Sequence, residues 1–209
     1  MIAIVNYGVG NLFSLRSSFA YIGAGCVVTG DPGEISRADK IVLPGVGAFA
    51  DAAAKLRDSG LGEVVREEAR KGKPLLGICL GMQLLLDRSH EYGESEGLGL
   101  VPGEVVPIAS AIPAGLKIPH IGWNALLFPG DRGKHPVFKY LEPGEHVYFV
   151  HSFYATNCSE SIAATTEYGA ILTAAVARGN ICGVQFHPEK SGNAGLRILK
   201  AFCEMEERA

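Results

Sequence analysis

The 209-residue sequence lacks the features that mark disulfide-bonded, zinc-binding, membrane-spanning and nucleic-acid-binding proteins. Its five cysteines are scattered singly, without a Cys-x-x-Cys pair, which argues against a disulfide framework and a zinc cluster. No stretch approaches the roughly 20 continuous apolar residues of a transmembrane helix. No segment is dense in lysine and arginine, and the formal net charge is −3. We therefore expect no metal, no membrane contact and no affinity for nucleic acid.

The sequence also lacks a basic, apolar leader, a linker, a low-complexity tract and an internal repeat. The opening MIAIVNYGVG is too short an apolar run for a secretory signal, so we expect a cytoplasmic protein. Its 47% hydrophobic and 20% charged residues are typical of a globular chain, and we expect one domain over residues 1–209. The cysteines other than Cys79 are predicted to be buried core residues: Cys26, Cys158, Cys182 and Cys203.

The first half of the chain alternates apolar strands with helices, a pattern typical of a parallel sheet covered on both faces. From residue 104 to about 186 the pattern is rich in strands. We therefore predict an α/β fold, with an open, mostly parallel, flavodoxin-like sheet flanked by helices and an antiparallel strand extension. The predicted early strands are 2–6, 26–29, 40–45 and 74–79; the predicted helices are 11–24 with Asn11 as N-cap, 48–72 with a break near Gly60 and Gly62, 80–89 and 193–206.

Cys79 lies in the run LLGICLGMQ (residues 75–83), where an apolar strand passes into a predicted helix. A nucleophile on such a sharp turn needs small neighbours, which Gly77 and Gly81 supply. The helix that begins at Leu80 directs its amide dipoles at the sulfur and favours the thiolate, and the Leu80 amide is free to stabilise an oxyanion. A core cysteine beside packing glycines is the structural alternative.

A cysteine nucleophile needs a base, since a free thiol with a pKa near ~8.5 is only slightly ionised at neutral pH. His187 ends the strand NICGVQF, and Pro188 favours an extended conformation there. In an extended chain, residues 187 and 189 share a face, so Glu189 can orient His187 toward Cys79. His151 is the competing base, but no carboxylate follows it two residues on, which favours a structural role.

GICLGMQ followed by GVQFHPE resembles the class I (triad) glutamine amidotransferases, over essentially the whole chain. The resemblance implies a Cys-His-Glu triad of Cys79, His187 and Glu189, glutamine as substrate, and no cofactor. In LPGVGAF (residues 43–49), a glycine-rich loop also follows a strand and can present backbone N–H groups. By similarity to the family, the strip Gly45, Val46 and Gly47 lies opposite Cys79 and, with Leu80, forms the oxyanion hole.

The resemblance also implies residues that bind glutamine. Gln83 lies one helical turn after Cys79 and, by similarity, contacts the substrate. Glu91 matches a carboxylate that meets the substrate ammonium, while Ser152 and Phe153 match a segment that offers backbone groups to the substrate carboxylate. Phe153 stands where many relatives have tyrosine.

Two further stretches, IVNYGVGNLFSL and IPHIGWN, resemble the glutaminase subunits of imidazole glycerol phosphate synthases of histidine biosynthesis. Asn6 stands where these relatives commonly have aspartate. The resemblance implies a separate (β/α)8-barrel cyclase that forms a heterodimer with this chain and receives its ammonia. Candidate contact residues are Asn11, Trp123 and Lys190. A gate is also expected: the Val46 N–H points away until the partner is loaded, which keeps turnover low.

Three alternatives remain at this point. The chain is a glutaminase subunit of another synthase, a stand-alone γ-glutamyl hydrolase or peptidase, or a non-catalytic subunit that only binds a barrel partner. The hydrolase would act without a partner and on larger γ-glutamyl substrates. The non-catalytic subunit would not need an intact set of Cys79, His187 and Glu189.

Overall fold

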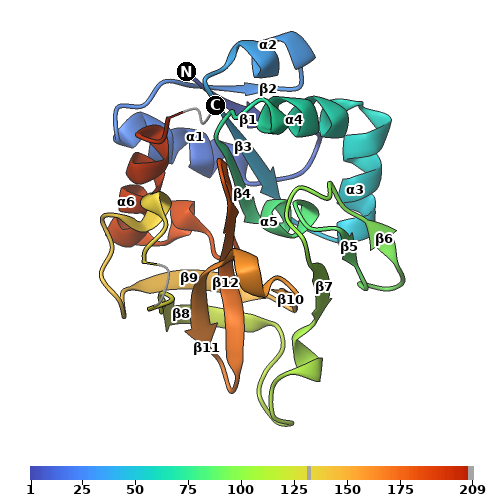
Figure 1. Cartoon of the computed structure of the whole chain (residues 1–209), viewed down its shortest axis with the longest axis vertical. Helices are drawn as coiled ribbons and strands as arrows, with labels where there is room; N and C mark the ends of the chain where they lie inside the picture. The colour runs from blue at the N-terminus through green and yellow to red at the C-terminus, as the bar shows by residue number, and fades with distance from the viewer. Residues whose placement is uncertain (131–132, 207–209) are drawn as a thin grey trace.

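The computed structural model describes residues 1–130 and 133–206, and its centre is a seven-stranded sheet (Figure 1). The strand order is β11-β12-β13-β4-β3-β1-β2. Strands β13, β4, β3, β1 and β2 run parallel, while β11 and β12 are antiparallel to their neighbours. The strands are β1 (Ile2–Val5), β2 (Cys26–Thr29), β3 (Lys40–Gly45), β4 (Leu75–Cys79), β11 (Ile162–Glu167), β12 (Ile171–Arg178) and β13 (Ile181–Val184).

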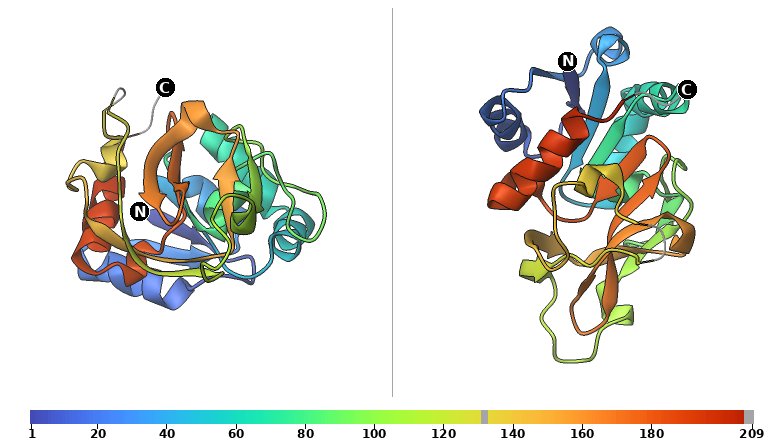
Figure 2. Two further views of the ribbon diagram at one scale, coloured as in Figure 1. Left: turned by 90° about the horizontal axis from the view of Figure 1, so that it is seen from below. Right: turned by 60° about the vertical axis from the view of Figure 1, so that its left-hand side comes forward.

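Helices cover both faces of this sheet, and each face has its own hydrophobic core. On one face, α1 (Leu12–Tyr21) and α6 (Gly192–Cys203) contribute to a core that contains Phe19, Ile198 and Phe202. These two helices lie side by side in both views (Figure 2). The other face is covered by α2 (Pro32–Arg37), α3 (Phe49–Asp58), α4 (Leu61–Arg70) and α5 (Leu80–Leu84). The break between α3 and α4 falls at Gly60, whose φ is 72°.

Two smaller sheets stand beside the carboxyl ends of the parallel strands. The first has the order β10-β7-β5-β6, and the second is the antiparallel pair β8-β9. Their strands are β5 (Arg88–Ser89), β6 (Ser95–Glu96), β7 (Glu104–Pro107), β8 (His120–Ala125), β9 (His146–His151) and β10 (Phe153–Thr156). Short 3-10 helices complete the fold: η1 (Ile108–Ser110), η2 (Pro136–Phe138), η3 (Ser159–Ser161) and η4 (Pro188–Lys190).

The predicted fold class is confirmed: helices flank a mostly parallel sheet whose antiparallel extension comes from the second half of the chain. The helix predicted for residues 80–89 is wrong, because α5 ends at Leu84 and residues 88–89 form β5. Tertiary hydrogen bonds explain the early stop. The carbonyl groups of Leu84, Leu85 and Leu86 accept bonds from the amides of residues 98–101, so they are not available to continue a helix.

Two smaller expectations also need correction. Asn11 occupies the N-cap position of α1, but its side chain makes no capping bond and instead reaches Glu189. Cys158 and Cys182 are buried as predicted, whereas Cys26 and Cys203 are partly exposed because they lie at the edge strand β2 and the last residue of α6. Among the described residues, no helix is both long and apolar enough to cross a membrane.

Candidate active site

A cavity of about 430 Å³ opens where β3 and β4 end, at the edge of the sheet where parallel α/β proteins bind ligands. It collects most of the residues that the sequence singled out. From those predictions, the lining contains Val46, Gly47, Cys79, Leu80, Gln83, Glu91, His151, Ser152, Phe153, His187 and Lys190. Tyr92, Pro119 and Val150 also line the cavity and were not predicted.

Cys79 sits at the junction of β4 and α5 in a backbone conformation that side chains rarely adopt, with φ of 55°. Glycines make this turn possible. A Cβ on Gly77 would lie 2.7 Å from the Gly81 carbonyl oxygen, and a Cβ on Gly81 would lie 1.8 Å from that of Leu43. The turn is therefore locked between β3 and α5, in agreement with the sequence argument from small neighbours.

Gly81→Ala should be strongly destabilising, because the added methyl group would overlap the backbone of the buried central strand β3. We expect a loss of about 3 kcal/mol or more, which in a chain of this size lowers the melting temperature by about 6–12 °C. Thermal unfolding followed by circular dichroism measures it. Gly25→Ala is the matched control, since nothing lies within 4 Å of its added Cβ. Equal melting temperatures for the two variants would contradict the close approach.

His187 contacts both partners that the sequence argument required. Its Nδ1 lies 2.8 Å from Glu189 Oε1, and its pKa reflects a further hydrogen bond to Cys79. Burial alone lowers the pKa of His187, but the hydrogen bonds to Cys79 and Glu189 and the charges on both groups outweigh burial and raise this pKa to about 9. The ring therefore favours the imidazolium form beside the sulfur.

The local backbone around His187 differs slightly from the expectation. His187 is extended, with φ −103° and ψ 98°, as Pro188 predicts. The next three residues, however, form the 3-10 helix η4 instead of continuing the strand. Ser191 stabilises this turn, because its Oγ donates to the His187 carbonyl at 2.6 Å. The turn, not a shared strand face, brings Glu189 to His187.

His151 lines the same cavity, but its ring is bonded away from the sulfur. Its Nδ1 donates to the Phe153 carbonyl at 2.8 Å, and its Nε2 lies 2.9 Å from His120 Nδ1. Burial lowers the pKa of His151 to about 4, so the ring is neutral at physiological pH. These contacts fit the structural role expected from the sequence.

The strip Gly45-Val46-Gly47 runs beside the nucleophile, because Gly45 pairs with Cys79 in the register of β3 and β4. Tyr7 fixes the start of the strip through a 2.7 Å hydrogen bond from its hydroxyl to the Pro44 carbonyl. Burial, together with the charge on Cys79, raises the pKa of Tyr7 well above its usual range, so this hydroxyl stays a donor. Leu80 occupies the first turn of α5, where backbone N–H groups have no partner within the helix.

Side chains predicted to bind glutamine are tied to the cavity wall. Gln83 Nε2 donates to the Phe153 carbonyl at 3.3 Å and to Gln185 Oε1 at 2.9 Å. With both of its N–H groups used by the protein, Gln83 has only its oxygen available for a ligand. Glu91 Oε2 accepts a 2.6 Å bond from the Phe49 amide at the start of α3, which holds its carboxylate at the cavity.

Gln185 was missed by the sequence argument, which treated GVQFHPE only as a recognition motif. Its side chain is fully buried, and its Nε2 lies 3.8 Å from Cys79 Sγ. The sequence did contain a signal for this residue: in an extended segment, the side chains of residues 185 and 187 point to the same face. A residue two positions before a candidate base therefore faces the same ligand.

Of the three predicted partner-contact residues, Lys190 lines the cavity. Trp123 is 52% exposed, and its ring meets Tyr148 edge-on at 6.0 Å. Lys190 Nζ lies over the same Tyr148 ring, 5.8 Å from its centre. Asn11 differs from the other two, because its Nδ2 donates to the buried Glu189 Oε1 at 3.3 Å. It therefore belongs to the triad's surroundings as well as to α1.

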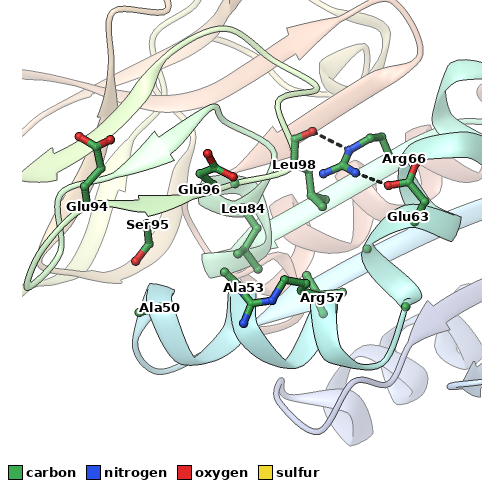
Figure 3. Close-up of a pocket in the computed structure, with 14 residues that line it drawn as sticks. Ala50, Ala53, Arg57, Glu63, Arg66, Leu84, Glu94, Ser95, Glu96 and Leu98 are labelled. Atoms are coloured by element: carbon green, nitrogen blue, oxygen red, sulfur yellow. Dashed lines mark hydrogen bonds and ion pairs between the residues drawn. The ribbon is translucent and has the colours of Figure 1, made fainter.

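A second cavity, of about 480 Å³, lies between α3 and β6 (Figure 3). Arg57 and Glu96 approach it from opposite walls, and Leu84 at the end of α5 also lines it. This cavity shares no lining residue with the cavity at Cys79. In the described part of the chain, no group of three or more His, Cys, Asp or Glu side chains is placed to hold a metal ion.

Comparison with known families agrees with this geometry. Residues 3–205 match the family model of the class I glutamine amidotransferases, and the chain belongs to this family. Solved structures share the fold: a crystal structure described as a glutamine amidotransferase superposes with a TM-score of 0.74 at 19% identity, covering 98% of each chain. PurLQS from Thermotoga maritima superposes with a TM-score of 0.72 at 20% identity, covering 97% of this chain and 96% of that one.

Closer relatives carry a more specific name. The chain is 48% identical over 209 residues to the imidazole glycerol phosphate synthase subunit HisH of Moorella thermoacetica, covering all of this chain and 96% of the relative. It is 50% identical over 205 residues to the subunit of the same name from Carboxydothermus hydrogenoformans, covering 98% of this chain and all of that one.

Proposed function

We propose that this protein is the glutaminase subunit of an imidazole glycerol phosphate synthase, hydrolysing glutamine to glutamate and ammonia. The observation that carries the proposal is that Cys79 and His187 line one cavity and interact there, while Glu189 Oε1 holds His187 Nδ1 at 2.8 Å from behind the cavity wall. That is the arrangement of nucleophile, base and orienting carboxylate on which acyl transfer depends. Near 50% identity to HisH subunits over the full chain supports the choice of synthase.

In the first half-reaction, the Cys79 thiolate attacks the side-chain amide carbon of glutamine. The carbonyl π electrons move to oxygen, and the resulting oxyanion is met by the Leu80 amide and by an amide of the Gly45-Val46-Gly47 strip. His187 then gives its proton to the amide nitrogen. The C–N bond breaks, ammonia leaves, and a glutamyl thioester remains on Cys79.

In the second half-reaction, a water molecule attacks the thioester while neutral His187 takes its proton. The C–S bond breaks, glutamate leaves, and the thiolate and imidazolium are restored. Glu189 stabilises the charged ring in both halves. Gln83 Oε1 and the Glu91 carboxylate are suited to accept from the substrate ammonium, while backbone groups of Ser152 and Phe153 meet its carboxylate.

The ammonia is proposed to pass directly to a (β/α)8-barrel cyclase in a heterodimer. In water at neutral pH ammonia is mostly protonated, and ammonium has no lone pair for attack, so a sealed route is needed. The exposed side chains of Ile121 and Trp123 lie two residues apart in β8 and therefore share one face of that strand, beside the cavity. They give a surface suited to that seal. A cytoplasmic location and a single domain over residues 1–209 remain predictions that accompany this assignment.

The assignment is tested by measuring glutamate release from glutamine in three samples: the chain alone, the chain with the barrel cyclase of its own organism, and that mixture with the cyclase's nucleotide substrate. We expect slow release alone and the fastest release in the loaded complex, because the Val46 peptide, next to a glycine on each side, can rotate into place. Equal rates in all three samples would rule out the gate. No release in any sample would contradict the function.

The same experiment separates the alternatives. A stand-alone γ-glutamyl hydrolase would act at full rate without the cyclase and would accept γ-glutamyl peptides. A subunit that only binds the barrel would form the complex without releasing glutamate. A glutaminase of a different synthase would hydrolyse glutamine without responding to this cyclase.

A further inference from the structure

We propose that Gln185 is a catalytic residue of this site, whose side-chain amide donates a hydrogen bond to Cys79 Sγ and stabilises the thiolate. The inference rests on the proposed function, because it assigns a second donor to the nucleophile of that reaction. It concerns a residue that lies outside the triad, the oxyanion strip and the expected glutamine contacts.

Gln185 is built into the floor of the site. It directly follows β13, its backbone amide donates to the Ala174 carbonyl at 2.8 Å, and its side chain is fully buried. Its Nε2 lies 3.8 Å from Cys79 Sγ, within the longer reach of a hydrogen bond to sulfur. Burying an amide is costly unless its groups are bonded, and here the sulfur takes one of the two amide N–H groups.

The orientation of this amide is fixed by its neighbours. The Phe153 carbonyl can only accept, so Gln83 must turn its NH2 group toward that carbonyl. The second N–H of Gln83 then points to Gln185 at 2.9 Å, and this contact requires the Gln185 oxygen on that side. The NH2 group of Gln185 is therefore directed at the sulfur. A flipped Gln185 would place NH2 against NH2 and an oxygen against the thiolate.

His151 helps to hold the Phe153 carbonyl, which is the acceptor that fixes the Gln83 amide. Its Nδ1 donates to the same Phe153 carbonyl at 2.8 Å, so that carbonyl has two donors and a fixed position. Gln83 therefore donates from one NH2 group both to the Phe153 carbonyl and to Gln185 Oε1, and Gln185 donates in turn to the sulfur. Because the Gln185 amide accepts at its oxygen, its own N–H groups are polarised toward the sulfur.

The helix that follows Cys79 is shorter than predicted from the sequence, so the Gln185 donor matters more for stabilising the thiolate. The helix after Cys79 was predicted to span ten residues but has only five, which shortens the row of peptide dipoles directed at the sulfur. Among the described residues, the His187 ring and the Gln185 amide are side-chain donors recorded at the sulfur. The sulfur is a thiolate before it attacks glutamine and again when the C–S bond of the thioester breaks, and at both stages the Gln185 amide is placed to donate to it.

The test measures the ionisation of Cys79 directly, by the pH dependence of its alkylation with iodoacetamide, read by mass spectrometry of the peptide that contains it. Two variants are compared with the unaltered protein. Gln185→Met removes the donor at similar length, and we expect the midpoint of alkylation to rise by about one pH unit or more. Gln185→Glu keeps an acceptor for Gln83 but turns an oxygen toward the sulfur, and we expect a larger rise.

Cys203 is partly exposed and distant in sequence from the site, so its alkylation in the same samples is the internal reference and should not shift. Circular dichroism identifies which variants fold. An unchanged Cys79 midpoint in either folded variant overturns the proposal, because a residue that only fills space would change stability without moving this titration.

A measurement on the unaltered protein decides the question if neither variant folds. The side-chain amide signals of Gln185 in a ¹⁵N-labelled sample should shift as Cys79 ionises, and signals that do not follow the thiol overturn the proposal. Alkylation needs no turnover, so the outcome is separate from the proposed function. If glutamine hydrolysis proved independent of Cys79, the function would fail while a raised midpoint would still show the hydrogen bond.

Discussion

Replacing Cys79 with alanine is expected to reduce glutamine hydrolysis at least about a thousandfold, in the isolated chain and in the complex with the cyclase. The thioester cannot form without the sulfur, and the oxyanion donors and His187 alone give only a small residual rate. Alanine is smaller than cysteine and keeps the backbone turn that Gly77 and Gly81 allow. We therefore expect the variant to fold and to bind the cyclase as the unaltered chain does.

A coupled glutamate dehydrogenase assay measures the loss, and a pull-down with the tagged cyclase checks that binding is retained. Cys203→Ala is the matched control, since Cys203 is partly exposed and is the last residue of α6, one of the helices that cover the sheet. Its hydrolysis should be unchanged. A Cys79→Ala variant that still releases glutamate at the normal rate would show that this chain hydrolyses glutamine by another route or serves only as a binding subunit.

The sharp turn that carries Cys79 could be predicted from the sequence because its requirements are local. An apolar strand, a nucleophile and glycines two residues to each side are all visible within nine residues. The contact between His187 and Cys79 is not local, since 108 positions separate them. It could be anticipated because both follow strands that end at the same edge of a parallel sheet, and β13 pairs directly with β4.

Features that depend on long-range hydrogen bonds were not visible in the sequence. The length of α5 is set by amides of residues 98–101, which take the carbonyl groups that a longer helix would use. Asn11 has the residue type and position of a helix cap, yet its side chain bonds to Glu189, which is distant in sequence. The hydrogen bonds of Gln83 and Gln185 likewise join α5, β10 and the residue that follows β13. Local propensity describes none of these competitions.

Glu189→Gln is the second change with a large expected effect, and it should lower kcat about a thousandfold with little change in KM. The amide oxygen can still accept from His187 Nδ1 at the present 2.8 Å, so the geometry is kept. The negative charge that stabilises the imidazolium is lost, and the ring is a weaker proton acceptor from the thiol. Steady-state kinetics in the loaded complex measure the effect, and Glu142→Gln, at an 82% exposed carboxylate, is the matched control.

The same variant should change stability in a pH-dependent way, and the sign follows from His187. Its pKa is about 9 in the folded protein and near 6.5 when unfolded. A pKa raised by folding adds stability that is complete below about pH 6.5 and is lost as the pH rises through about 9. Because Glu189 is one of the groups that raise this pKa, Glu189→Gln should destabilise the protein most near pH 6 and least near pH 9.5. Urea unfolding at both pH values measures the difference, and a destabilisation that grows with pH would show that the buried carboxylate does not stabilise a charged His187.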